Sequence, residues 1–264
     1  MVAQSPTRLR WLLRQWWFLY LILLVSSLAW EDQNRPDRDW RWDDDVPHEP
    51  ALSVPRMDDA GPIPEAGLNR VAYRIWPVQA GALGPNATAR PTPILLIHGS
   101  PGEAADFDRL ARPLRDAGYR VIAIDLPGFG ESWCYPGTVR MSALAHARTV
   151  LACLDELHIP RAHILGWSLG GAVALNIADL APDRVASLTL MASVSEQATE
   201  GSGNYYYEHA KYAAGWTILT AIRYGVPHFG LLSGLDVMRT SMRNFWDTDL
   251  RPLRGIMERL PAPT

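Results

Sequence analysis

The sequence has little lysine, little cysteine and no excess of positive charge. Lys211 is its only lysine, and the formal net charge is −3, so we expect no nucleic-acid partner. Cys134 and Cys153 are too few for a disulfide framework, and no Cys-x-x-Cys or histidine pairing accompanies them. We therefore expect neither a metal nor a cofactor. Two buried thiols are the favoured interpretation, although one disulfide remains possible if the protein is exported.

A long apolar run occurs once, within residues 1–30. Arg8, Arg10 and Arg14 precede the uncharged stretch Gln15–Trp30, and including the preceding Trp11–Leu13 brings the run to the ~20 residues that cross a bilayer. The pattern predicts a single-pass membrane helix with a cytoplasmic N-terminus and the rest of the chain on the other side. The alternative is a signal peptide cleaved after Ala29, which would release the protein by secretion.

Composition changes again after the apolar run. Residues 31–69 are rich in proline and acidic residues, which predicts an extended linker. Residues 70–194 alternate between short apolar runs and helical patterns. Strands are expected at 70–77, 93–97, 119–124, 162–165 and 185–191, and helices at 104–117, 141–158 and 172–180. This alternation predicts a doubly wound α/β domain.

The stretch Gly166-Trp167-Ser168-Leu169-Gly170-Gly171 lies between an expected strand and an expected helix. A Gly-x-Ser-x-Gly in this setting is typical of a nucleophile elbow, in which the serine occupies a sharp, strained turn and glycines remove clashing side chains. The N-terminus of the following helix favours negative charge, so the backbone N–H of Leu169 is a candidate oxyanion donor.

Three segments in order carry a family resemblance: His98–Gly102, Asp125–Ser132 and Gly166–Gly171. With them, residues 70–264 resemble the α/β-hydrolase fold. The resemblance implies a mostly parallel sheet and a helical cap in residues 195–264. It makes Ser168 the nucleophile, and the backbone N–H groups of Leu169 and Ser100 the oxyanion hole. It also gives His98 and Asp125 structural roles, with His98 ordering the oxyanion loop and Asp125 fixing the turn that follows it.

The family's catalytic acid and histidine have no clear counterpart. Only His209 and His228 follow Ser168, and both lie in the expected cap. In the family, a segment like Pro261–Thr264 leads into the strand before the acid, so we expect a C-terminally truncated chain whose last strands, acid and histidine lie beyond Thr264. Glu196 is a weak candidate for the acid.

The resulting hypothesis is a membrane-tethered serine hydrolase that cleaves carboxylic esters through an acyl-enzyme on Ser168. A small-molecule ester or lipid-like substrate is expected because the cap region is rich in apolar and aromatic residues, namely Tyr205, Tyr206, Tyr207, Trp216, Phe229, Leu231, Leu232 and Trp246. The alternatives are a peptidase or carbon–carbon bond hydrolase of the same fold, and an inactive binding or scaffold protein.

Overall fold

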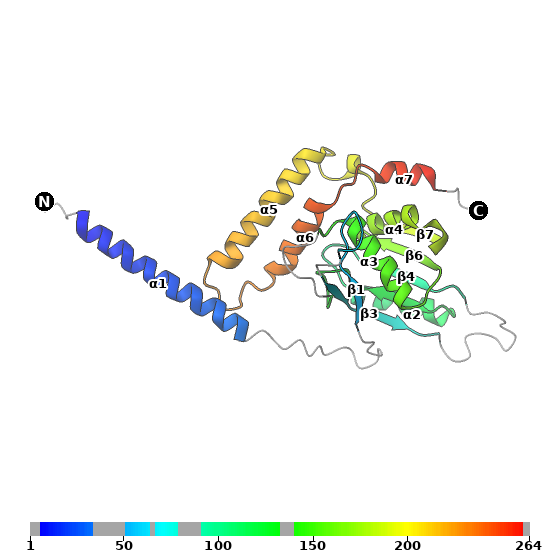
Figure 1. Cartoon of the computed structure of the whole chain (residues 1–264), viewed down its shortest axis with the longest axis horizontal. Coiled ribbons are helices and arrows are strands. Elements are labelled where there is room, and N and C mark those ends of the chain that lie inside the picture. The colour runs from blue at the N-terminus through cyan, green and yellow to red at the C-terminus, as the bar shows by residue number, and fades with distance from the viewer. Residues whose placement is uncertain (1–5, 34–50, 64–66, 79–90, 133–139, 261–264) are drawn as a thin grey trace.

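The computed structural model describes residues 6–33, 51–63, 67–78, 91–132 and 140–260 (Figure 1). Its strands are β1 (Leu52–Pro55), β2 (Leu68–Val71), β3 (Tyr73–Trp76), β4 (Ile94–Ile97), β5 (Val121–Ile124), β6 (Ala162–Trp167) and β7 (Val185–Met191). Its α-helices are α1 (Pro6–Gln33), α2 (Asp108–Asp116), α3 (Ala143–Glu156), α4 (Leu169–Leu180), α5 (Tyr205–Gly225), α6 (Leu235–Asp247) and α7 (Leu253–Arg259). Short 3₁₀ turns are η2 (Ala104–Phe107), η3 (Pro182–Arg184) and η4 (Gln197–Thr199).

The main sheet has five strands in the order β3-β5-β4-β6-β7. β3 is antiparallel to β5, and the other neighbouring pairs are parallel. Ile97 at the end of β4 pairs with Ile124 of β5 and Gly166 of β6. The carboxyl ends of these three strands therefore meet at one edge, which is where ligands bind in open α/β sheets.

Helices cover both faces of the sheet, so its central strands are apolar along their whole length. Side chains such as Leu95, Ile122 and Ile164 pack with α3 and α4 in the larger core cluster. Alternate residues, such as Leu96 and Ala123, pack on the opposite face with η2 and α2. This two-sided burial explains why the strands show continuous apolar runs instead of alternation.

One segment expected to be a linker contributes to the core. Leu52–Pro55 forms β1, which pairs antiparallel with β2. Val54 is fully buried in the larger core cluster, so the prediction of an extended linker over residues 31–69 is wrong for this part. Residues 34–50 lie outside the described residues.

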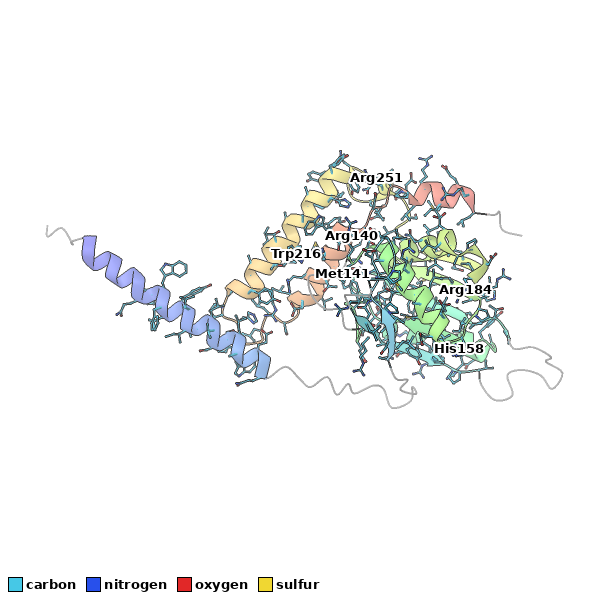
Figure 2. All side chains as sticks on the ribbon, in the orientation of Figure 1. Arg140, Met141, His158, Arg184, Trp216 and Arg251 are labelled. Atoms are coloured by element: carbon cyan, nitrogen blue, oxygen red, sulfur yellow. The ribbon has the colours of Figure 1, made fainter. Side chains whose placement is uncertain are left out.

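Helices α5 and α6 form an antiparallel hairpin that projects from the sheet domain (Figure 1). Its base is fastened to the start of α3. Asp247 and Thr248 accept hydrogen bonds from the N–H groups of Met141 (2.9 Å) and Ala143 (3.0 Å), and Asn244 donates to the Met141 carbonyl (2.5 Å). Figure 2 labels Met141 near this junction and Trp216 on α5.

The N-terminal apolar run is helical as expected, because α1 spans Pro6–Gln33. Within the described residues, however, no helix combines the length and the apolar character that crossing a bilayer requires. The uncharged stretch Gln15–Trp30 has 16 residues. As an α-helix it measures about 24 Å, against a hydrocarbon core of about 30 Å. The expected membrane-spanning helix is therefore unsupported; the chain's orientation to a membrane and the cleaved-signal alternative stay predictions.

Candidate active site

Ser168 occupies the turn between β6 and α4, with φ 52° and ψ −118°. This left-handed backbone is costly for a residue with a side chain, and contacts on both sides hold it in place. The Ser168 N–H donates to the Met191 carbonyl at the end of β7 (3.1 Å). The Ser168 carbonyl accepts from the N–H groups of Gly171 and Val194 (both 2.9 Å). The end of β7 thus helps to hold the expected nucleophile in its strained conformation.

The glycines around the serine are required by close packing. A Cβ on Gly166 would lie 2.2 Å from the Gly170 carbonyl oxygen, and a Cβ on Gly170 would lie 2.1 Å from the Ile97 carbonyl oxygen. Both obstacles are backbone atoms, which cannot rotate away as a side chain can. The first turn of α4 therefore sits directly against the end of β4, which carries the loop beginning at His98.

The structure brings the Gly99–Ser100 turn against Ser168. The position of a Cβ on Gly99 lies 3.0 Å from the Ser168 Cβ and 3.5 Å from its Oγ. Leu169 is the first residue of α4, and the first N–H groups of a helix have no acceptor within the helix. Leu169 directly follows the serine, and Ser100 directly follows the Gly99 that packs against it, so both predicted oxyanion donors belong to segments next to Ser168. Their catalytic role stays a prediction.

Both ring nitrogens of His98 are hydrogen-bonded to backbone groups, so His98 is unsuited to act as a base. It is fully buried, and its Nε2 accepts a hydrogen bond from the Leu126 N–H (2.9 Å). The proton must then lie on Nδ1, which donates to the Gly99 carbonyl (2.6 Å). Burial lowers the pKa of His98 to about 4, which keeps the ring neutral.

The hydrogen bond from His98 Nδ1 to the Gly99 carbonyl also fixes the orientation of the peptide group between Gly99 and Ser100. In a trans peptide the carbonyl and the following N–H point in opposite directions. Holding the Gly99 carbonyl toward His98 therefore turns the Ser100 N–H away from the imidazole ring. His98 thus sets the direction of one predicted oxyanion donor without touching the reacting atoms.

Asp125 has the structural role expected from the sequence. Its carboxylate accepts hydrogen bonds from the N–H groups of Ala104 (2.5 Å) and Glu131 (2.9 Å), so it ties together two loops at the carboxyl edge of the sheet. Burial raises the pKa of Asp125, and these two N–H donors partly offset the rise. A Cβ on Gly130 would lie 2.4 Å from the carboxylate, so the turn closes tightly over it.

In the described part of the chain, no histidine forms a hydrogen bond with the Ser168 hydroxyl. His209 contacts the Tyr205 carbonyl within α5 (3.0 Å), and His228 is buried at the far end of the hairpin beside Arg223. Glu196, the weak candidate for the acid, pairs with Arg254 (3.2 Å). The structure therefore places none of these three residues in a triad with Ser168.

The structure adds one polar contact that sequence reasoning missed. His146 of α3 is buried, with its Nε2 2.8 Å from the Asn244 side-chain nitrogen. Its ring also lies edge-on to Phe129, which in turn lies edge-on to His98. Burial lowers the pKa of His146 to about 3. No local pattern signals this contact, because Asn244 and Phe129 lie far from His146 in the sequence, in two other segments.

Other side chains in the described residues offer no metal site. No group of three or more His, Cys, Asp and Glu side chains there could hold an ion. Cys153 is a free, buried thiol, and burial raises its pKa well above the ordinary range. Cys134 lies outside the described residues, so the alternative of a disulfide stays open.

Comparisons with known proteins agree with this architecture. Residues 92–247 match the family model described as alpha/beta hydrolase fold. The chain is 49% identical over 102 residues to the dihydrolipoyllysine-residue acetyltransferase component of an acetoin cleaving system from Pseudomonas putida, covering 39% of this chain and 27% of that protein. It is 44% identical over 101 residues to a 2-hydroxy-6-oxononadienedioate/2-hydroxy-6-oxononatrienedioate hydrolase from Cupriavidus pinatubonensis, covering 37% of this chain and 35% of that protein.

Solved structures give the same fold at lower identity. An α/β-hydrolase fold protein from Burkholderia ambifaria matches with a TM-score of 0.53 and 21% identity, covering 82% of this chain and 79% of that one. A thermophilic esterase from Thermogutta terrifontis matches with a TM-score of 0.50 and 21% identity, covering 80% and 73%. The curated relatives are matched over only about a quarter to a third of their length. Because the family model covers more than half of the sequence, the chain belongs to the alpha/beta hydrolase fold family.

Proposed function

We propose that this protein is a serine hydrolase that forms an acyl-enzyme on Ser168. The observation that carries the proposal is the geometry of the elbow. A partly exposed serine with a left-handed backbone directly precedes α4, and Gly99 packs against its side chain. Several relatives are named as hydrolases, which supports the reaction class.

The proposed reaction has two halves. The Ser168 Oγ attacks the substrate carbonyl carbon, its proton passes to a base, and the N–H groups of Leu169 and Ser100 stabilise the oxyanion. The leaving group departs with a proton, and water then attacks the acyl-enzyme to release the acid and regenerate the hydroxyl. We assign the base to a histidine outside the described residues, because a serine hydroxyl needs such a partner to become nucleophilic.

The first candidate substrate is a small carboxylic ester. A second candidate is a carbon–carbon bond next to a ketone, because the names of several relatives at 40–44% identity describe hydrolases of 2-hydroxy-6-oxo dienoates and related diacids. Both reactions begin with the same attack on a carbonyl carbon, so the site geometry favours neither. The third possibility, an inactive binding or scaffold protein, predicts no covalent chemistry at Ser168.

A fluorophosphonate probe tests the nucleophile directly. We expect covalent labelling of the full 264-residue chain that disappears in Ser168→Ala and persists in Ser187→Ala, which changes an exposed serine on β7. If the base is not positioned in this chain, labelling will be slow, and added imidazole will accelerate it. Absence of labelling with and without imidazole would support the binding protein.

Substrate panels then separate the two reactions. Short-chain p-nitrophenyl esters report ester cleavage, and a 2-hydroxy-6-oxo dienoate reports carbon–carbon cleavage through loss of its visible absorbance. Turnover of only one class, abolished by Ser168→Ala, would assign the substrate. Turnover that survives Ser168→Ala would contradict the acyl-enzyme proposal.

A further inference from the structure

Helix α1 carries apolar side chains that the rest of the protein leaves largely exposed. Between Gln15 and Trp30 there is no charged residue. Nine of its side chains are 45–70% exposed, namely Trp16, Trp17, Phe18, Leu19, Leu21, Ile22, Leu23, Val25 and Trp30. Successive residues of an α-helix point about 100° apart, so the runs Trp16–Leu19 and Leu21–Leu23 face every direction around the axis. Covering this helix requires apolar contact on all of its faces.

The far end of the α5–α6 hairpin continues this surface. We call this end the hairpin tip and define it by its exposed apolar residues, which are 41–88% exposed: Tyr224, Val226, Phe229, Leu231, Val237 and Met238. Figure 1 shows that the tip lies away from the sheet domain and meets the C-terminal end of α1. The two exposed apolar regions are therefore neighbours in space.

Specific contacts join α1 to the tip. Ser27 is fully buried, and its hydroxyl oxygen accepts hydrogen bonds from the N–H groups of His228 (2.8 Å) and Phe229 (2.7 Å). The Tyr20 hydroxyl donates to the Gly225 carbonyl, and the Trp30 ring lies edge-on to Phe229. These contacts fix one end of α1 against the tip.

The charges at this junction cancel one another. Arg223 is buried and binds Glu31 of α1 (2.6 and 2.8 Å) and Asp236 of α6 (3.2 Å). Asp236 also binds Arg239 (2.8 Å), whose guanidinium lies over the Tyr224 ring, 4.9 Å from its centroid. The two arginines and two carboxylates of this cluster satisfy each other and together carry no net charge.

We propose that α1 and the hairpin tip together form a surface that binds an anionic lipid bilayer within one leaflet. A second copy of this chain would cover only one face of α1, whereas lipid surrounds an immersed helix. The first turns of α1 carry Arg8, Arg10 and Arg14, and arginine binds phosphate groups such as those of anionic headgroups. The uncharged stretch of about 24 Å is shorter than a hydrocarbon core of about 30 Å but longer than one leaflet's half of it, so within one leaflet the helix must lie along or oblique to the membrane plane.

Vesicle flotation of the full-length protein tests this surface. We expect the protein to float with vesicles of phosphatidylcholine and phosphatidylglycerol at 7:3, and less with phosphatidylcholine alone or in high salt. Phe18→Glu on α1 and Leu231→Glu at the tip should each weaken binding roughly tenfold or more, because a charge is costly in lipid. Both side chains are exposed, so circular dichroism should show an unchanged fold.

Tyr206→Glu is the matched control. Tyr206 is 76% exposed, but it lies at the opposite end of α5, about 28 Å along the helix from the tip. The Tyr206→Glu variant should therefore float with the vesicles as the unaltered protein does. Ser168→Ala should also float normally, so failure to bind vesicles and failure to label the serine are separate results.

Three outcomes would overturn the proposal. The first is no flotation with either vesicle. The second is unchanged flotation of Leu231→Glu, which would remove the tip from the surface. The third is a dimer in analytical ultracentrifugation that dissociates in Phe18→Glu while vesicles bind nothing, which would assign the surface to a second copy of the chain.

Discussion

Gly170→Ala is the most direct test of how the elbow packs. Gly170 lies in the first turn of α4, and an added methyl group would sit 2.1 Å from the Ile97 carbonyl oxygen and 2.7 Å from that of His98. An ordinary van der Waals contact of a Cβ atom begins near 3.4 Å. Relief of the clash requires α4 and the end of β4 to separate by about 1 Å, because no side chain can move instead.

The energetic terms oppose each other. In an unhindered helix, alanine is more favourable than glycine by about 1 kcal/mol. Overpacking a rigid site costs about 1–3 kcal/mol, and obstruction by backbone places this site at the upper end. We expect a net loss of about 1–2 kcal/mol in the free energy of unfolding. The same separation displaces Gly99 from Ser168, and a misplacement of about 1 Å can lower a rate about 100-fold.

Urea denaturation measures the stability, and the rate of fluorophosphonate labelling reports on the site. Gly225→Ala is the control, because a Cβ there has no neighbour within 4 Å; it should be neutral or stabilising, with normal labelling. Equal stability of Gly170→Ala and Gly225→Ala would show that α4 and the end of β4 do not pack as closely as described. If only stability falls and labelling stays normal, the link between α4 packing and the predicted oxyanion loop is refuted.

Three further predictions concern the buried polar groups. Burial lowers the pKa values of His98 and His146 to about 4 and 3, whereas an unfolded histidine has a pKa near 6.5. Their contribution to stability should be complete above pH 6.5 and decline toward pH 4 by up to about 1.4 kcal/mol per pH unit each. Denaturation at several pH values measures how the free energy of unfolding depends on pH. His146→Gln should remove the part of this dependence that His146 contributes. His158→Asn, which changes an exposed residue, should leave the dependence as it is in the unaltered protein. Asp125→Ala should lower the free energy of unfolding by about 2–5 kcal/mol, because two backbone N–H groups lose their acceptor; an unchanged urea midpoint would contradict its structural role. Arg223→Ala leaves the buried Glu31 carboxylate without its arginine partner, whereas Asp236 keeps Arg239. We expect a cost of about 3–5 kcal/mol, with faster hydrogen exchange at the α1–hairpin junction and not in α4. Equal protection at the junction would contradict the contact.

The sequence predicts the sheet well because burial on two faces leaves a local signature. Ile94–Ile97 and Val121–Ile124 are short continuous apolar runs, and each ends in a segment that belongs to the site. The elbow is equally local, since Gly166, Ser168 and Gly170 are close in sequence and fix their own backbone. These features could be predicted from a few neighbouring residues.

The α1–hairpin junction could not be predicted in that way. Glu31 and Arg223 are separated by 192 positions, and neither lies in a recognisable motif. Val54 illustrates the same limit, because a proline-rich and acidic composition predicts a linker, whereas the Val54 side chain is buried in the core and Leu52 packs against it. Composition averages over a segment, whereas packing is decided by individual side chains.

The two halves of the candidate site depend on different kinds of information. The proposed nucleophile and its predicted oxyanion donors depend on backbone geometry, which close glycine packing enforces at Gly99, Gly166 and Gly170. A proton acceptor is instead a single side chain that tertiary structure must bring to Ser168, and the histidines of the described residues serve other contacts. His98 illustrates the difference, because both of its ring nitrogens are engaged by the backbone. A histidine next to a strand end is therefore poor evidence for a base, whereas a serine that strained backbone holds beside a glycine turn is good evidence for a nucleophile.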